Sequence, residues 1–213
     1  MKIYGYFRSS AAYRVRIALN LKGLAPEALS LHLAKGQQRA SDYLALNPQG
    51  LVPALVTDEG GVLTQSLAII DWLDETHPEP PLLPSDALGR ARVRGLAQAI
   101  ACDIHPLNNL RVLNYLTNTL GISDDQKSGW YRYWIDTGFE ALEQRLAREP
   151  DTGRFCHGDT PTLADICLVP QVANSHRYKM DLSPYPTIVR IDAACLALPA
   201  FAAAVPDKQP DAF

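Results

Sequence analysis

The sequence has few cysteines, and no spacing joins them into a recognisable site. Its four cysteines, Cys102, Cys156, Cys167 and Cys195, lie far apart and form no C-x-x-C pair. Disulfide frameworks and structural zinc sites depend on such pairs, so we expect reduced and mostly buried thiols. Cys102 and His105 form one pair without further candidate ligands, and the sequence therefore predicts no metal site.

The chain also has no long apolar run and no excess of basic charge. Its first residues, MKIYGYFRSS, contain no apolar stretch of signal-peptide length, and no later run approaches the ~20 residues that span a bilayer. A formal net charge of -3 provides no basic field that would attract nucleic acid or anionic lipid. We therefore expect a cytoplasmic protein that binds neither nucleic acid nor membrane.

Apolar residues are nevertheless abundant enough for a large core. With 213 residues, of which 47% are hydrophobic, the chain can form one sizeable domain or two small ones. Its first part alternates between the two periodicities of strands and helices. The expected elements are a strand at 2–7, a helix at 10–22, a strand at 27–33, two short strands around a hairpin turn at 58–61, and a helix at 66–77. This order, βαβ followed by ββα, predicts a small α/β domain.

The composition changes at HPEPPLLPSD, where four prolines mark a linker. No later segment has a convincing strand pattern, so the rest of the chain is predicted to be all α. The expected boundaries are 1–80 for the α/β domain, 81–88 for the linker and 89–213 for the helical domain.

Several helices are expected in this second part. Ser85 or Asp86 can cap a long helix that Pro106 should kink. Further helices are expected from Ser123 to a point before Pro150, from 162 to about 177, and from about 187 to 196. Thr162-Leu163-Ala164-Asp165 has the pattern of a capping box, with Asp in the place of the usual Glu, so we expect a structural role for this carboxylate.

Two adjacent serines stand at the start of the first helix, within FRSSAAYRVRIAL. Ser9 or Ser10 can simply cap that helix, because its first amides have no partner within the helix. The same hydroxyls and amides also favour an anion, and a thiolate is one candidate. No cysteine of the chain is near, so such a thiol would have to arrive on a ligand.

Two other short stretches extend this hypothesis. Gln65-Ser66 opens another helix, whose N-terminus can hold a carboxylate. Val52-Pro53 begins a strand at which a backbone edge can pair with an extended peptide. Each feature has an ordinary structural explanation. Together they describe a site for a small peptide, with its backbone at Val52, a carboxylate at Ser66 and a sulfur atom at Ser9 and Ser10.

At this point the chain resembles a known family. The stretches FRSSAAYRVRIAL, ALNPQGLVPAL, TQSLAIIDWL, CDIHPLNNLRVL, GDTPTLADICLVPQV and DLSPYPTIVRID are similar to the zeta class of the glutathione transferase superfamily, which includes the maleylacetoacetate and maleylpyruvate isomerases. The resemblance runs from the first strand to the last predicted helix. It implies a thioredoxin-like N-terminal domain, an all-α C-terminal domain, a homodimer and a cis peptide bond before Pro53.

The resemblance also implies a set of glutathione-binding residues, with Ser9 donating to the thiolate. The matching positions are Ser9, Ser10, Gln38, Val52, Pro53, Gln65, Ser66 and His105. The family's Ser-Ser-Cys motif has Ala11 in place of its cysteine here. His105 has an alternative interpretation, as part of a polar surface with Asn108 and Asn109.

The implied reaction is the glutathione-dependent cis-trans isomerisation of a maleyl keto acid. A nucleophile must add to the double bond, allow rotation and leave again, while a cation faces the developing enolate. Arginine suits carboxylate recognition, and Arg8, next to the sulfur site, is expected to bind the carboxylate or enolate. Arg111 and Arg177 look similar to further anion-binding positions of the family. The catalytic residues are thus expected to be Ser9, Ser10 and Arg8, whereas Arg14 and Arg16 are interpreted as structural.

Two other functions remain open at this stage. The same thiolate could conjugate or dehalogenate small electrophiles such as haloacids, or the fold could act as a non-catalytic binding module. The presence of Ser9, Gln65 and Ser66 argues against the binding module. The sequence does not choose between maleylacetoacetate and maleylpyruvate, because both carry the same reacting group.

Overall fold

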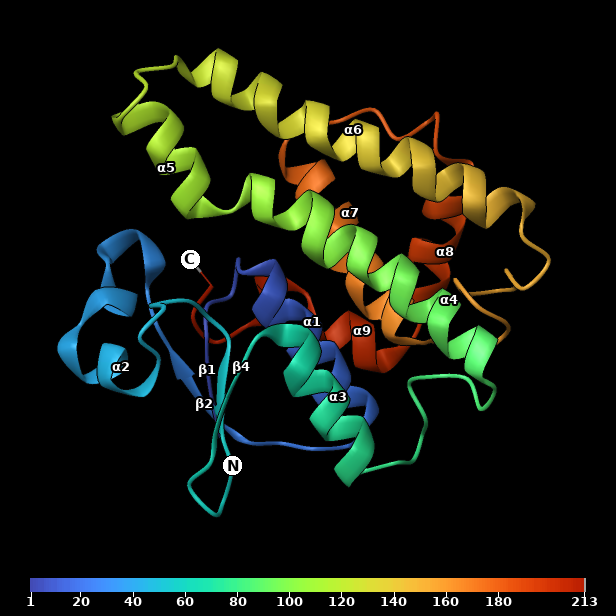
Figure 1. Cartoon of the computed structure of the whole chain (residues 1–213), viewed down its shortest axis with the longest axis horizontal. Helices are drawn as coiled ribbons and strands as arrows, with labels where there is room; N and C mark the ends of the chain where they lie inside the picture. Colours follow the sequence, from blue (N-terminus) through green and yellow to red (C-terminus); the bar gives the residue numbers. More distant parts are fainter. Residues whose placement is uncertain (213) are drawn as a thin grey trace. The chain divides into compact units, whose positions relative to one another are not determined.

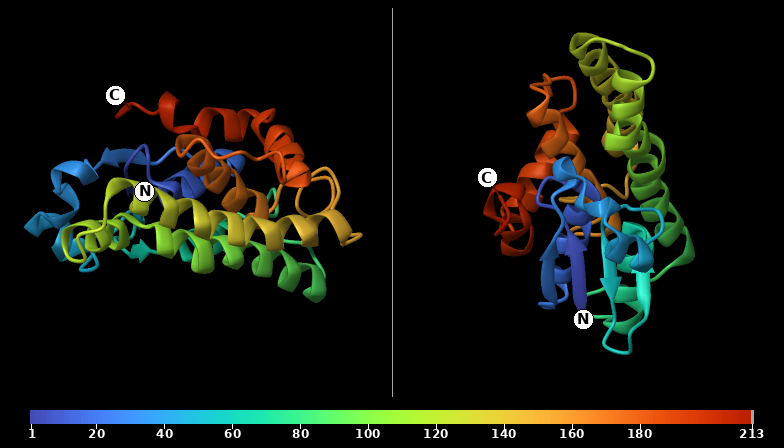
Figure 2. Two further views of the ribbon diagram at one scale, coloured as in Figure 1. Left: turned by 90° about the horizontal axis from the view of Figure 1, so that it is seen from above. Right: turned by 90° about the vertical axis from the view of Figure 1, so that its left-hand side faces the viewer.

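Four strands form a mixed sheet in the computed structural model, which describes residues 1–212 of the chain (Figure 1). The strands are β1 (Lys2–Gly5), β2 (Glu27–Ser30), β3 (Ala54–Val56) and β4 (Val62–Thr64), in the spatial order β2-β1-β3-β4. β1 and β2 are parallel and lie side by side in Figure 2, whereas β3 runs antiparallel to both β1 and β4. The predicted α/β arrangement and its hairpin are therefore confirmed.

Helices α1 (Ser10–Leu21) and α3 (Ser66–Thr76) pack against each other beside this sheet. Shorter helical segments connect β2 to β3: η1 (Leu33–Lys35), η2 (Gln37–Arg39) and α2 (Ser41–Leu46). A partly buried ion pair joins the two long helices, because the Lys22 ammonium lies 2.6 Å from a carboxylate oxygen of Asp74 and 2.6 Å from the carbonyl oxygen of Pro80. This lysine thus fastens the end of α1 to α3 and to the proline-rich segment.

Two strands are shorter than the sequence predicted. β1 ends at Gly5 instead of residue 7, because the Ser9 amide donates to the Tyr6 carbonyl oxygen at 3.0 Å and closes a turn. β2 ends at Ser30 instead of residue 33, where η1 begins. The peptide bond between Val52 and Pro53 is cis, as the family resemblance implied.

The described chain divides into two units, with boundaries that differ from the expected ones. The first unit combines Met1–Pro81 with the segment that begins at Leu198, and the second unit is Leu82–Ala197. The sequence places residues 198–212 in the helical domain. They belong to the first unit because α9 (Pro199–Ala204) packs along α1 and buries Phe201, and η5 (Pro206–Lys208) follows it.

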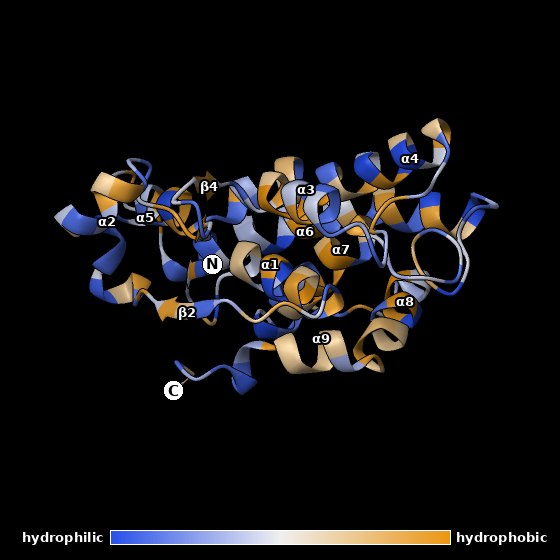
Figure 3. Ribbon diagram, turned by 90° about the horizontal axis from the view of Figure 1, so that it is seen from below, coloured by the Kyte–Doolittle hydropathy of each residue, from blue (hydrophilic) through white to orange (hydrophobic). Residues whose placement is uncertain are grey.

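The second unit is helical, and its described residues contain no strand. Its helices are α4 (Ala87–Gln98), α5 (Leu110–Asn118), α6 (Asp124–Arg148), α7 (Leu163–Arg177) and α8 (Pro186–Leu196). α7 is almost entirely buried, packs against α4 and α8, and is mainly orange in Figure 3, the colour of apolar residues. None of the helices in residues 1–212 is long and apolar enough to cross a membrane.

The predicted helix starts agree with the structure. Asp86 caps α4 by accepting a 2.8 Å hydrogen bond from the Gly89 amide, and Ser123 forms a capping box with Gln126 at the start of α6. The expected capping box of Thr162 and Asp165 is present at α7. The Asp165 carboxylate also accepts a 2.8 Å hydrogen bond from the Cys156 amide, so it fixes the preceding loop as well as the helix.

The long helix that was expected to kink at Pro106 is instead interrupted before it. α4 ends at Gln98 and is followed by a π-helical turn, η3 (Ala99–Ile104), by the 3₁₀ turn η4 (His105–Asn108), and then by the separate helix α5, which was not predicted. Proline lacks the amide that would continue the helix. Gly138 of α6 lies against this irregular segment, where an added Cβ would be 2.2 Å from Cδ1 of Ile104.

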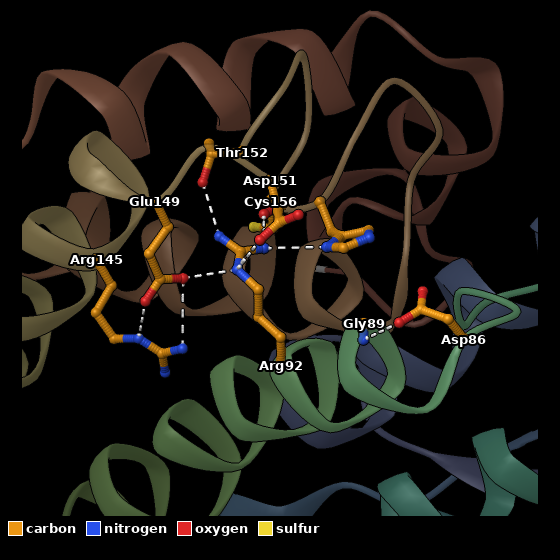
Figure 4. A network of polar contacts seen from close by, with 9 residues as sticks. Asp86, Gly89, Arg92, Arg145, Glu149, Asp151, Thr152 and Cys156 are labelled. Atoms are coloured by element: carbon orange, nitrogen blue, oxygen red, sulfur yellow. Dashed lines mark hydrogen bonds and ion pairs between the residues drawn. The ribbon is translucent and has the colours of Figure 1, made fainter.

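An arginine network holds the loop between α6 and α7 (Figure 4). The guanidinium of Arg92, on α4, donates to the Glu149 carboxylate at 2.6 Å, to the Cys156 carbonyl oxygen at 2.7 Å and to the Thr152 hydroxyl at 2.8 Å. It also lies 3.2 Å from Nδ1 of His157. Arg145 donates to the same Glu149 carboxylate at 2.7 Å, so the loop is tied to two helices.

We expect Arg92→Gln to lower the free energy of unfolding by about 1–3 kcal/mol, because the Cys156 carbonyl group loses its guanidinium donor and the Glu149 carboxylate keeps only Arg145. Urea unfolding measures the loss. Arg94→Gln, on the same helix but outside this network, is the matched control and should change stability by less than about 0.5 kcal/mol. Equal losses in the two variants would contradict the interpretation.

Asp192 should make stability depend on pH. Burial raises the pKa of this α8 carboxyl from 3.8 to about 7. Between these values the unfolded chain releases the proton while the folded protein keeps it. Stability should therefore decrease as pH rises toward 7, by at most about 1.4 kcal/mol per pH unit from this group. Urea unfolding from pH 4.5 to 8 should show that Asp192→Asn removes this contribution, and parallel curves for the two proteins would refute it.

Candidate active site

The sheet topology gathers three of the predicted site elements at one edge. β1 and β4 run in the same direction, since both are antiparallel to β3. α1 and α3 follow the carboxyl ends of these strands, so their N-termini lie at the same edge of the sheet. β3 runs the opposite way, and the Val52-Pro53 peptide that precedes it therefore lies at that edge too.

Ser9 occupies the N-cap position of α1. Its Oγ accepts a 3.2 Å hydrogen bond from the Ala12 amide, and no acidic residue stands in the first turn of this helix. A serine oxygen that accepts one hydrogen bond still carries a proton to donate. Ser9 is partly exposed, whereas Ser10 is buried. The capping role and the anion-binding role proposed for these serines are thus compatible in one residue, Ser9.

Ser66 begins α3 and is held by a residue that the sequence analysis treated as structural. The Arg14 guanidinium is buried and donates to the Ser66 hydroxyl oxygen at 3.3 Å. The serine proton therefore remains available to a ligand. The sequence contains a signal for the burial of this arginine, because Arg14 follows Ser10 by one helical turn and so lies on the apolar side of α1. Gln65 adopts a positive φ of 68° and donates its side-chain amide to Gln49 Oε1 at 3.1 Å.

The segment before β3 offers backbone groups outside the sheet. Sheet pairing begins at Ala54, two residues after Val52. Val52 is half-buried, and the neighbouring Leu51 carbonyl oxygen is already occupied by Asn47, whose Nδ2 donates to it at 2.8 Å. Gln38, on η2, has a side-chain oxygen that is buried and has no hydrogen-bond partner among the described residues.

Arg8 lies in the turn between β1 and α1, next to Ser9 in the sequence. Its side chain is exposed, and its guanidinium carbon lies 4.9 Å from the centre of the Phe7 ring. An arginine above an aromatic face keeps its charge and its planar set of donors. The first unit thus places one cation beside the hydroxyl at the start of α1.

His105 and Arg111 lie close in sequence within the second unit. His105 is half-buried and begins η4, directly after the π-helical turn. Arg111 is exposed in the first turn of α5, where its amide donates to the Asn109 side-chain oxygen at 3.0 Å. Irregular turns of this kind within helices are often found at functional sites.

Arg177 ends α7 and contacts two tyrosines. Its Nη2 donates to the Tyr131 hydroxyl at 3.3 Å, and its guanidinium carbon lies 5.4 Å from the centre of the Tyr178 ring. The two rings are stacked, with centres 3.6 Å apart. Burial raises the pKa of Tyr131 to about 12, so this phenol is neutral near pH 7 and supports the arginine without neutralising it. No motif in the sequence pointed to Tyr131 as part of the site.

The cysteines are all free, as the spacing predicted, and most are buried. Cys156, Cys167 and Cys195 are buried, while Cys102 is exposed. Burial raises the pKa of the Cys156 and Cys195 thiols, with the nearby Asp165 carboxylate adding to the effect, so these sulfurs are poor nucleophiles. Within residues 1–212, no group of three or more histidine, cysteine or acidic side chains could hold a metal ion.

Models of the glutathione S-transferase family match both parts of the chain. The N-terminal domain model of this family matches residues 3–81, and its C-terminal domain model matches residues 135–203. A maleylpyruvate isomerase from Ralstonia sp. is 53% identical over 211 residues, which cover 99% of each chain.

Two solved structures of maleylacetoacetate isomerases are also similar. One, from Methylobacterium extorquens AM1 with bound malonate and glutathione, is 48% identical, with a TM-score of 0.98 and full coverage of both chains. The other, from Anaeromyxobacter dehalogenans 2CP-1 with dicarboxyethyl glutathione and citrate, is 46% identical, with a TM-score of 0.88 over 100% of this chain and 97% of that one. The chain therefore belongs to the glutathione S-transferase family, in the zeta class that contains the maleylacetoacetate and maleylpyruvate isomerases.

Proposed function

We propose that the protein catalyses the glutathione-dependent cis-trans isomerisation of a maleyl keto acid to its fumaryl isomer. The observation that carries this proposal is Ser9, whose hydroxyl caps α1 and keeps a proton to donate at the start of that helix. Support comes from the similarity to isomerases of this type over the whole chain. The first unit would bind glutathione, and the second would contribute to the keto-acid site.

The residues at the sheet edge suit glutathione in chemical type. The tripeptide presents a thiol, peptide groups and carboxylates. The chain presents the Ser9 hydroxyl, the backbone of Val52, and the start of α3 at Gln65 and Ser66. Arg14 beneath Ser66 adds a buried positive charge, which favours a carboxylate there. Ser10, Gln38, Pro53 and His105 are included in the proposed glutathione site on the family resemblance.

Bound glutathione would supply a thiolate that adds reversibly to the activated double bond and so permits rotation about it. The contribution of the chain is to hold the thiol in its ionised form. A thiol with an ordinary pKa of about 8.5 is mostly protonated at pH 7. A donated hydrogen bond from Ser9 and the positive end of α1 both favour the charged form.

The proposed role of the arginines is to bind the anionic keto acid. Arg8, Arg111 and Arg177 are exposed residues. A guanidinium binds a carboxylate through two parallel hydrogen bonds and can stabilise negative charge that develops on the conjugated carbonyl oxygen. Arg8 neighbours Ser9 in the sequence, and we assign to it the developing charge. Malonate and citrate, bound in two similar isomerases, are carboxylates as well.

The proposed function includes a cellular compartment and an oligomeric state for the protein. We propose a cytoplasmic enzyme, because all four cysteines are free, as in proteins of reducing compartments. A homodimer is proposed on the family resemblance alone. The choice between maleylacetoacetate and maleylpyruvate stays open, because relatives that carry each name are about equally similar, at 48% and 53% identity.

One assay separates this function from its alternatives. We expect the protein, glutathione and either maleyl keto acid to give the fumaryl isomer while the free thiol concentration stays constant. Consumption of thiol would instead indicate a conjugating or dehalogenating transferase. Absence of both product and glutathione binding would indicate a binding module. Comparing the two keto acids by kcat/KM identifies the preferred substrate.

Ser9→Ala should raise the pKa of the bound thiol by about one to two units, because a hydrogen bond to a charged group contributes about 1.5–3 kcal/mol. Ultraviolet absorption of the thiolate, followed over pH, measures this shift. Ser9→Thr retains both the cap and the donor and should behave like the original protein. An unchanged thiol pKa in the alanine variant would contradict the role of Ser9.

Arg177→Gln should lower kcat/KM for the maleyl keto acid by about tenfold, equivalent to about 1.4 kcal/mol of lost carboxylate binding. Activity towards an uncharged electrophile such as 1-chloro-2,4-dinitrobenzene should change far less. Arg148→Gln, at the exposed end of α6, is the matched control. A similar loss for charged and uncharged substrates would exclude carboxylate recognition by Arg177.

A further inference from the structure

The position of Ser9 depends on a short connection that is neither strand nor helix. β1 ends at Gly5 and α1 begins at Ser10, so residues 6–9 carry the serine outside the sheet ladder. Within this connection, the Ser9 amide donates to the Tyr6 carbonyl oxygen at 3.0 Å. Any movement of the Tyr6-Phe7 backbone would therefore move Ser9 with it.

Two charged side chains hold that backbone from both sides. The Phe7 amide donates to Oδ2 of Asp211 at 3.0 Å. Arg16 donates to the Phe7 carbonyl oxygen through Nη2 at 3.1 Å and to the Tyr6 carbonyl oxygen through Nη1 at 3.5 Å. Both backbone polar groups of Phe7 are thus bound, one by a carboxylate and the other by a guanidinium.

Asp211 reaches this connection from a point 204 residues later in the chain. The segment that carries it is fastened to α1 along its length: Nε of Arg16 donates to the Ala204 carbonyl oxygen at 3.1 Å, and Nδ2 of Asn20 donates to the Ala200 carbonyl oxygen at 2.8 Å. The side-chain amide of Gln209 then donates back to the Val205 carbonyl oxygen at 2.9 Å. Arg16 therefore binds the C-terminal segment and the Ser9 connection at the same time.

We propose that Asp211 and Arg16 are positioning residues, through which the C-terminal segment of the first unit holds Ser9 in place for the sulfur of glutathione. This inference rests on the proposed function of Ser9 and adds a part of the chain that no site prediction included. Charged partners make stronger hydrogen bonds than neutral ones, which suits a connection that the sheet does not hold. Arg16 remains charged near pH 7, because burial lowers its pKa only to about 10.

The loss of Asp211 should affect two properties of glutathione binding differently, namely the affinity for the tripeptide and the pKa of its bound thiol. The contacts assigned to the tripeptide backbone and carboxylate lie at Val52, Gln65 and Ser66, on other elements. Loss of Asp211 should therefore leave the affinity for glutathione nearly unchanged at a pH below the bound thiol pKa, where these contacts dominate binding. It should weaken the preference for the thiolate, because only the Ser9 hydroxyl is displaced. If the C-terminal segment only stabilised the fold, the loss of Asp211 would not raise the thiol pKa while leaving the affinity unchanged.

The experiment compares Asp211→Ala and Asp211→Asn with the original protein. Asp207→Asn, an exposed carboxylate of the same segment, is the matched control. Ultraviolet titration should show a bound thiol pKa that is raised by about half a unit in Asp211→Ala, which corresponds to about a threefold lower thiolate fraction below the pKa. Asp211→Asn should lie between Asp211→Ala and the original protein. At a pH about one unit below the bound thiol pKa of the original protein, kcat should fall about threefold, while the glutathione affinity measured by calorimetry at that pH should not change, because most of the bound thiol is then protonated.

A second measurement needs no glutathione. In the free protein, hydrogen exchange of the Phe7 amide should become about tenfold faster in Asp211→Ala but not in Asp207→Asn, because that amide loses its acceptor. Faster exchange without a change in thiol pKa would overturn the inference, as would unchanged exchange. If the original protein itself fails to lower the thiol pKa, the proposed function fails instead, so the two failures are distinguishable.

Discussion

The start of α1 sets the main physical constraint in this protein. The first amides of a helix need acceptors, and Ser9 supplies one at 3.2 Å while its own proton stays free to be donated. An acidic cap would satisfy the same amides but would repel an anion. Serine is therefore suited to both tasks, and the chemistry proposed for the site depends on the direction in which this one hydroxyl points.

The sheet explains why several anion-binding groups can meet at one edge. Two parallel strands, β1 and β4, deliver two helix N-termini there, and an antiparallel strand between them brings the Val52-Pro53 peptide to the same edge. Two arginines add positive charge at this edge, one from a buried position and one from an exposed position. Arg14 lies buried beneath Ser66, whereas Arg8 lies on the surface beside Ser9. The buried arginine donates to the Ser66 hydroxyl, and the exposed one is the residue to which we assign the developing charge.

Local signals predicted most of the fold. Hydrophobic periodicity located α1, α3, α6, α7 and α8, and capping residues such as Asp86 and Ser123 located helix starts to within a residue or two. The sequence could not predict contacts between distant segments. The packing of α9 on α1 depends on tertiary neighbours that no local pattern specifies. For the same reason, the serines were found from their place in the sequence, while the links from Arg14 to Ser66 and from Asp211 to Phe7 were not.

The burial of the cysteines has a consequence for an enzyme that would work with a thiol ligand. Oxidised glutathione exchanges with protein thiols, and the reaction requires an accessible thiolate. Cys156, Cys167 and Cys195 are shielded from this exchange by burial. Among the described residues, Cys102 is the exposed cysteine, and it lies in the π-helical turn three residues before His105. Any exchange of this kind among the described cysteines would therefore be limited by exposure to Cys102, while the three buried thiols of the core would be spared.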